Sequence, residues 1–497
     1  MSKRLRLWNT ATVKAMRISH STLGLALGAL LYLVCISGSV AVFYEDFERW
    51  EQPAIPEYQA YDDQSLSQAV DNHLQQLEAP PQTLYVVLPT ETLPRIHLAS
   101  LDEADTSTEW YVNQSGDLVA QPHAPWQEMV TNLHNHLLLP ETLGLIITGS
   151  LGAALCALII SGFLAHPSLI KDLFRFRKHR SSRLRQLDLH NRLAVWGLPF
   201  HLMMGVTGAF FGLVGVLAAS GAWLWYDNDR DALIADIYGP DIETVDAGGT
   251  INYDRALQQL SQIEPDATPI YLIIQNIGTD QQLLEVAATL PQRLVFSEIY
   301  RFHPDGTPLG NQGLADGPGG RQVAYSVYRL HFGHFGGIWT KLIYLVMGIG
   351  LSLICATGIN VWLIRAPRAT WLAPLWSGFV YAVPGSLGVA ASGSLLGGSP
   401  ILVFCSSLIM LTALFGWIRF SALSRRWTIG ILAAVTAAIP ATHLLSFSGT
   451  EFPLAVIVIN LSFAGMSLAL ILLALRGFRP ARGETANLAV LDNHQTS

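Results

Sequence analysis

Eight apolar segments dominate the sequence, and each is long enough to cross a bilayer as a helix. A spanning helix needs about 20 mostly apolar residues. The windows that meet this requirement are 18–44, 141–165, 190–226, 338–364, 371–391, 400–418, 427–447 and 452–475. Only 13% of the 497 residues are charged, whereas soluble chains carry about 25%. The composition excludes an ordinary soluble protein, a disordered chain and a nucleic-acid-binding protein, and it predicts a membrane all-α helical bundle.

The distribution of positive charge predicts how the chain is oriented. Most of the 30 Lys and Arg residues lie before the first span, between the second and third, and after the fourth, sixth and eighth. The positive-inside rule places such segments in the cytoplasm. We therefore expect a multi-pass protein of a bacterial inner membrane with both termini in the cytoplasm. The first span is too long for a signal peptide and is expected to remain as an anchor.

Two polar inserts, at about 45–133 and 227–330, are then expected in the periplasm. Each combines an amphipathic helix with alternating apolar runs that end at a glycine turn, which is typical of a small α+β module. The expected division is a cytoplasmic tail with the first helix (1–44), module 1 (45–133), helices 2 and 3 with the basic loop 166–189 (134–226), module 2 (227–330), helix 4 (331–370), additional helices 5 to 8 (371–475) and a cytoplasmic tail (476–497).

The order of span, module and span occurs twice, over 18–165 and 190–364, and both copies have the same orientation, as in parallel repeats. Each of the first four spans also contains a small hydroxyl residue before a glycine. These pairs are Ser37–Gly38, Ser161–Gly162, Thr207–Gly208 and Thr357–Gly358. Small residues allow helices to approach closely in lipid, and we expect only that structural role for them.

The four cysteines all fall within predicted spans. They are Cys35, Cys156, Cys355 and Cys405. There is no Cys-x-x-Cys-His sequence for covalent haem attachment. We expect them to act as small buried apolar residues.

Four histidines take matching positions in the two copies. His20 and His190 each precede the glycine of their span by 18 residues, which places both at cytoplasmic helix ends. His134 and His331 precede theirs by 28 and 27 residues, at the periplasmic starts of returning helices. Two imidazoles that face each other across a bundle can bind the iron of a b-type haem, whereas zinc needs more ligands. The pattern predicts two haem b sites, one between His20 and His190 and one between His134 and His331.

Other histidines compete for these positions. His136 lies two residues after His134 and points another way, and His334 lies one turn from His331. His201, eleven residues after His190 on the same predicted helix, falls on the same face and is an alternative ligand. The others are expected to be ordinary surface or loop residues: His73, His97, His123, His166, His179 and His303.

At these residues the chain resembles the PepSY-associated transmembrane family. The similar motifs are Met16–Arg17–Ile18–Ser19–His20, Leu133–His134, Leu189–His190–Asn191–Arg192 and Leu330–His331–Phe332–Gly333, with PepSY-like modules in the inserts. The likeness extends over about 10–370, and helices 5 to 8 depart from it. The family contains bacterial, often iron-regulated inner-membrane proteins, including di-haem ferric-siderophore reductases. The resemblance implies that His20, His134, His190 and His331 bind two haems.

The leading hypothesis is therefore electron transfer across the membrane to a ferric siderophore or other ferric chelate in the periplasm. The donor would be a cytoplasmic flavoprotein or a quinol of the bilayer, since the sequence encodes no nucleotide-binding domain. Two alternatives remain open. One is a periplasmic binding or regulatory protein that the spans only anchor. The other is a chelate or metal transporter through helices 5 to 8, although these lack carboxylates or lysines within the spans for coupling.

Overall fold

The protein is described here from a computed structural model, which covers residues 9–102, 106–166, 182–239, 249–365, 371–420 and 425–476. In these ranges eight helices are long and apolar enough to cross a membrane. They are α1 (Thr10–Ala41), α5 (Glu141–Ala165), α7 (Leu198–Trp225), α11 (Gly337–Leu363), α12 (Leu372–Leu395), α13 (Pro400–Phe420), α14 (Arg425–Ser446) and α15 (Leu454–Arg476). This confirms a multi-pass membrane protein with a helical bundle.

The chain divides into two compact units. The second contains α12 to α15, which are the additional helices 5 to 8 of the sequence analysis. Within it, Gly378 of α12 lies so close to the Thr412 carbonyl of α13 that any side chain there would clash, and α14 and α15 are joined by a hydrogen bond between His443 and Asn460. The first unit holds the duplicated segment.

One of the predicted spans is interrupted. The window 190–226 covers the end of α6 (Ser182–Trp196) and all of α7, and the two helices are separated at Gly197 just before Pro199. Proline lacks an N–H and favours the first turn of a new helix. His190 and His201 therefore lie on different helices, and the prediction that they share one helical face is wrong.

Short helices also precede α5 and α11. The helix α4 (Pro125–His136) ends where Leu137 and Leu138 adopt positive φ angles of 58° and 56°. The helix α10 (Gly319–Phe332) ends at Gly333, with φ of 75°. The sequence predicted His134 and His331 at the starts of the spanning helices. They lie instead on these short helices, α4 and α10.

The two polar inserts form one continuous antiparallel sheet. The first contributes β1 (Thr83–Val87), β2 (Ile96–Leu101), β3 (Ser107–Val112) and β4 (Leu118–Ala120), and the second contributes β5 (Thr268–Gln275), β6 (Leu283–Thr289), β7 (Glu298–Phe302) and β8 (Pro308–Asn311). The strand order is β4-β3-β2-β1-β5-β6-β7-β8, and β1 pairs with β5. The two α+β modules are thus joined edge to edge, so that two strand edges that would otherwise be exposed satisfy each other.

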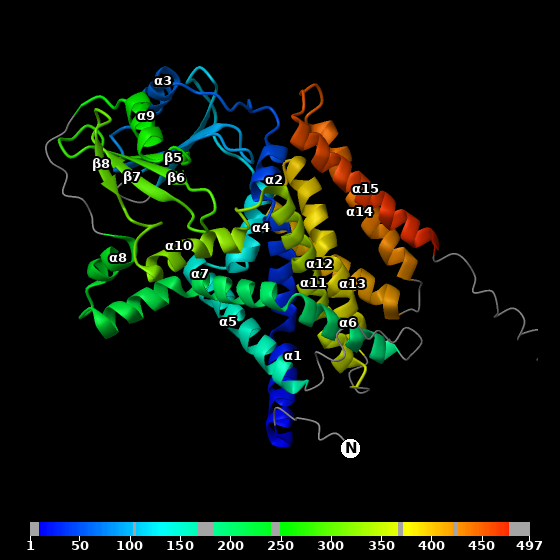
Figure 1. Cartoon of the computed structure of the whole chain (residues 1–497). Coiled ribbons are helices and arrows are strands. Elements are labelled where there is room, and N and C mark those ends of the chain that lie inside the picture. Colours follow the sequence, from blue (N-terminus) through cyan, green and yellow to red (C-terminus); the bar gives the residue numbers. More distant parts are fainter. Residues whose placement is uncertain are drawn as a thin grey trace, which may run out of the picture. The chain divides into compact units, whose positions relative to one another are not determined.

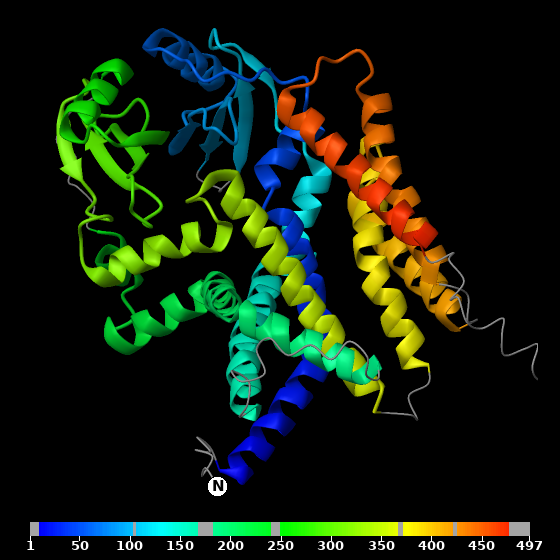
Figure 2. The ribbon, with the colours of Figure 1, turned by 45° about the vertical axis from the view of Figure 1, so that its right-hand side comes forward.

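A shared apolar core explains this joining. Alternate residues of the central strands, Leu84 and Leu272 among them, are fully buried under α3 (Asp63–Leu74) and α9 (Tyr253–Ile263). Each buried Leu or Val contributes roughly 1.5–3 kcal/mol. Both helices lie on the side of the sheet away from α1, α5, α7 and α11, and the start of α1 lies at the far end of the bundle that these four helices form (Figures 1 and 2). We call the two ends of the bundle the sheet side and the distal side.

The helix α2 (Tyr44–Glu51) connects α1 to the sheet and fixes α4. The carboxylate of Glu51 accepts hydrogen bonds from the backbone N–H groups of Trp126 (3.1 Å) and Gln127 (2.8 Å) at the start of α4. These N–H groups have no partner within their own helix. Glu51 therefore orients the helix that carries His134.

On α2, Glu48 accepts a hydrogen bond from the Tyr111 hydroxyl of β3. Burial raises the pKa of Glu48 to about 7; His97 and Arg95 oppose the shift, and Glu45 and Glu109 add to it. The folded protein therefore binds a proton here that the unfolded chain releases above about pH 4.5. Stability from this group is complete below that pH and is lost as the pH rises towards 7, by at most about 1.4 kcal/mol per pH unit.

We predict that Glu48→Gln weakens the pH dependence of unfolding. Between about pH 5 and about pH 8, the melting temperature of the detergent-purified wild type should fall more than that of the variant, because only the wild type must ionise a buried carboxyl. The exposed Glu78 supplies the control, since Glu78→Gln should behave like the wild type. Equal pH dependence in the wild type and Glu48→Gln would contradict the assignment.

Candidate functional site: two histidine pairs

The structure brings the four predicted histidines together in the two predicted pairs. On the sheet side, the ring centroids of His134 and His331 are 6.1 Å apart. On the distal side, the ring centroids of His20 and His190 are also 6.1 Å apart. His134, His190 and His331 come from α4, α6 and α10, whereas His20 lies on the long helix α1. All four rings are half-buried.

Each ring is held through its Nδ1 atom. In three cases Nδ1 donates to a backbone carbonyl: His134 to Val34 (2.9 Å), His20 to Leu158 (2.9 Å) and His190 to Ile354 (3.0 Å). A carbonyl can only accept, so Nδ1 must carry the proton. In the fourth case the Thr207 hydroxyl already donates to the Met203 carbonyl and therefore accepts from His331 Nδ1 at 2.8 Å.

These hydrogen bonds define the tautomer of all four imidazoles. With the proton on Nδ1, Nε2 carries a free lone pair, which is the form that binds a metal. A histidine that ligates a metal almost always donates its other N–H to a carbonyl, carboxylate or water. The four side chains are thus in the state that a ligand requires.

Each hydroxyl–glycine pair forms the place on a spanning helix against which one histidine ring packs, and we call this place the seat of that histidine. A Cβ atom at Gly38 would lie 2.5 Å from Cε1 of His134, and one at Gly162 would lie 3.0 Å from Cε1 of His20. At Gly358 and Gly208 the distances to His190 and His331 would be 3.2 and 3.6 Å. In the three carbonyl cases the acceptor lies four residues before the glycine. The expectation that these pairs only allow close helix packing is therefore incomplete, because each pair receives one imidazole.

A cavity of about 410 Å³ lies at the sheet-side pair. His134 and His331 line it together with apolar and aromatic side chains of α1, α5, α7 and α11, among them Leu31, Phe200 and Phe211. The Phe211 ring lies 5.4 Å from the His331 ring. The cavity therefore offers an apolar enclosure next to two imidazoles with free Nε2 atoms.

The competing histidines lie elsewhere. His201 is 2% exposed and its ring is hydrogen-bonded to the Met347 carbonyl of α11. The His334 ring lies 6.0 Å from Tyr44, and its Nε2 is 4.0 Å from Glu45. His136 ends α4, and its Nδ1 is buried without a hydrogen-bond partner among the described residues.

The remaining histidines have other surroundings. His73 bonds to Ser100, His97 to Glu109, and His123 is exposed. His303 is half-buried, and His166 follows the last residue of α5. His179 and most of the predicted basic loop lie outside the described residues.

A buried ion cluster borders the sheet-side cavity. Lys341, 3% exposed in the first turn of α11, donates to Glu45 (3.1 Å) and Asp46 (2.9 Å) of α2. Tyr44, whose ring touches that of His334, lines the cavity. Burial lowers the pKa of His334, and Glu45 opposes this shift. A charge as buried as that of Lys341 is tolerated only when it is paired. These two ion pairs join the two copies at the sheet side.

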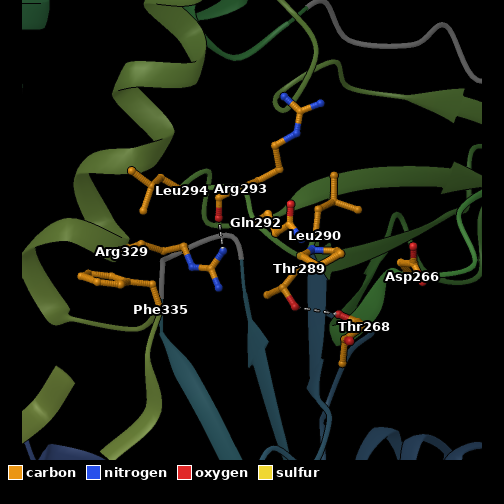
Figure 3. A pocket seen from close by; sticks show the side chains of 10 residues that line it. Asp266, Thr268, Thr289, Leu290, Gln292, Arg293, Leu294, Arg329 and Phe335 are labelled. Atoms are coloured by element: carbon orange, nitrogen blue, oxygen red, sulfur yellow. Dashed lines mark hydrogen bonds between the residues drawn. The ribbon is translucent and has the colours of Figure 1, made fainter. Parts of the chain in front are cut away.

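A second pocket of about 380 Å³ lies where β5 begins and β6 ends, next to the end of α10 (Figure 3). Arg329 donates to the main-chain carbonyl of Arg293 at 2.7 Å within it. Arg329 lies two residues before His331. Phe335, which also lines this pocket, has its ring 6.3 Å from Tyr344, and Tyr344 lines the sheet-side cavity. One aromatic contact therefore connects the pocket to the cavity.

The comparisons with known proteins agree with this architecture. The chain is 29% identical over 258 residues to the uncharacterized protein PA4219 of Pseudomonas aeruginosa, which covers 49% of this chain. The chain spans 65% of the length of that relative. The family model of the PepSY-associated TM region matches residues 17–365. This range includes both histidine pairs and the whole sheet. The chain belongs to the family of the PepSY-associated transmembrane region.

Proposed function

We propose that the protein is a b-type di-haem protein of the bacterial inner membrane that moves electrons across the bilayer and reduces ferric iron or a ferric siderophore in the periplasm. The main support is that two histidine pairs have the same centroid separation and the same Nδ1-bonded tautomer. The resemblance of the histidine motifs to those of di-haem ferric-siderophore reductases points the same way.

The spacing of the rings leaves room for one metal ion between the two members of each pair. Two imidazole nitrogens at about 2 Å from the same metal ion, with about 1 Å from each nitrogen to its ring centre, allow ring centres up to about 6 Å apart. Both pairs have a separation of 6.1 Å. His134 and His331 would hold one haem, and His20 and His190 the other.

The surroundings of the pairs favour haem over a bare metal ion. In the described part of the chain, no cluster of three or more His, Cys, Asp and Glu side chains is arranged to hold a metal. Two imidazoles leave zinc two ligands short, whereas a porphyrin provides the remaining nitrogens itself. The apolar lining of the sheet-side cavity suits the macrocycle, which at each pair would supply a centre that takes up and gives up one electron.

The residues of the chain would position and tune these centres. The Nδ1 hydrogen bonds orient the rings and raise the basicity of Nε2. The packed Leu and Cys side chains of α1, α5 and α11 would exclude water from the part of the bundle between the sheet-side pair and the distal pair. The distribution of positive charge supports a cytoplasmic position for the distal pair, where the proposed electron donor would reach it, and a periplasmic position for the sheet.

The pocket at the ends of β5 and β6 is the proposed place of the ferric chelate. It is separated from the sheet-side cavity by the Phe335–Tyr344 contact. Arg329 and the main chain around Arg293 provide polar groups there. Reduction releases iron because hard oxygen ligands bind Fe(III) far better than Fe(II).

An absorption spectrum tests the cofactor. We expect two b-type haems per chain in detergent-purified wild type, and one in His134→Ala, His331→Ala, His20→Ala or His190→Ala, since each change removes one axial ligand. His123→Ala, a change at an exposed loop residue, should keep both. A folded but colourless wild type from haem-replete cells would refute the proposal and favour a membrane-anchored binding protein.

Alanine substitutions at two of these glycines, Gly38 and Gly208, give a second test of haem binding at the sheet-side pair. Gly38→Ala should lose the haem of the sheet-side pair, because its Cβ would lie 2.5 Å from His134. Gly208→Ala should keep it, because its Cβ would lie at an ordinary 3.6 Å from His331. Both changes favour a helix by up to about 1 kcal/mol, so helix propensity cannot explain a difference. Equal haem contents in the two variants would contradict the role of Gly38.

A redox assay tests the reaction. Protein reduced under anaerobic conditions should be reoxidised by a ferric chelate and should release Fe(II) that a ferrous-specific dye traps. The gallium complex of the same chelator is the control, since it binds in the same way but takes up no electron. His331→Ala should slow the reaction at least about tenfold, as expected when a group needed for one step is removed. Reoxidation at the same rate with gallium would rule out ferric reduction.

A further inference from the structure

Two cysteines meet at the interface between α1 and α11. The thiols of Cys35 and Cys355 lie within hydrogen-bonding distance of each other. Both pack against the apolar cluster formed by Leu31, Leu151, Leu155, Leu158 and Leu351. All four cysteines were expected to act only as small buried apolar residues, whereas the fold brings two of them together from opposite ends of the duplicated segment.

The packing of the two helices supports this pairing independently. A Cβ at Gly28 of α1 would lie 2.9 Å from Ile359 of α11, and one at Gly348 of α11 would lie 2.4 Å from the Ser39 hydroxyl of α1. These contacts define an antiparallel register that puts Cys35 opposite Ser352, one helical turn from Cys355. The glycines bring the two backbones close, as a bridge between side chains as short as cysteine requires.

The thiols also connect the two histidine pairs. Cys35 directly follows Val34, whose carbonyl accepts from His134. Cys355 directly follows Ile354, whose carbonyl accepts from His190. A bond between the two sulfur atoms would therefore link the seat of a sheet-side histidine to the seat of a distal one.

One of the thiols faces open space. Cys35 lines the sheet-side cavity, whose walls are largely apolar. An apolar environment disfavours the charged thiolate, so exchange with a water-soluble disulfide such as oxidised glutathione should be slow. A lipid-soluble oxidant is better suited to this position within the bilayer.

We propose that Cys35 and Cys355 are a redox-active thiol pair that a membrane quinone oxidises to a disulfide between α1 and α11. Two S–H bonds break and one S–S bond forms. The quinone takes up the two electrons and the two protons and leaves as the quinol. The disulfide locks the seats of His134 and His190 together. This proposal goes beyond the proposed function and does not depend on bound haem.

The test uses the full chain with Cys156→Ser and Cys405→Ser, so that only the pair remains of the four cysteines. The protein is reduced, treated with a fully substituted benzoquinone, which cannot add a thiol to its ring, and then unfolded and labelled with a maleimide. We expect the labelled thiols to fall from two per chain to nearly none, with a cross-linked peptide pair from α1 and α11 in the mass spectrum. Oxidised glutathione should leave most of the label in place.

The matched control carries Cys35→Ser and Cys355→Ser and keeps the other two cysteines. Its labelling should not change with the quinone. Retention of both labels in the first variant, equal loss in the control, or disulfide-linked dimers on a gel would each overturn the proposal. Because the readout is thiol labelling, these results are independent of whether the protein binds haem.

Discussion

The hydrogen bond from each imidazole Nδ1 into the helix that faces it is the interaction on which the site depends. A half-buried histidine in an apolar bundle needs a partner for its N–H, and a residue beside the hydroxyl–glycine pair, or the hydroxyl itself, provides one. The absent side chain of the glycine makes room for the ring, most tightly at Gly38. The same device, used four times, sets both the direction and the tautomer of the rings, and so produces two pairs with equal spacing.

The sheet extends this duplication outside the bundle. Pairing of β1 with β5 merges the two inserts into one layer under α3 and α9, and Glu51 of α2 orients α4 and with it His134. The ion cluster of Lys341, Glu45 and Asp46 joins the copies again beside the sheet-side cavity. The position of one imidazole pair is thereby coupled to the folding of the polar inserts, and neither copy can complete a pair alone.

Local pattern was enough to predict much of the molecule. Spans can be predicted from apolar length because lipid leaves no alternative to a helix for satisfying the backbone. The strands of the two inserts and one amphipathic helix in each insert, observed as α3 and α9, follow from the period of apolar residues. His20, His134, His190 and His331 could be paired because duplication repeats their spacing. The break between α6 and α7 at Gly197 was not predicted, because the apolar window continues through it. For the same reason the prediction that His201 shares a helical face with His190 is wrong.

Contacts between residues that are distant in the sequence could not be predicted from the sequence. The sequence contains Ser37–Gly38 as a common helix-packing motif, and nothing local says that an imidazole from α4 will occupy it. The pairing of β1 with β5 and the contact of Cys35 with Cys355 join segments that are more than 180 residues apart. Periodicity and composition are properties of neighbouring residues, and they specify which elements form and what they bury. Which side chains face each other depends on how helices cross and break, and this is set by packing between distant elements.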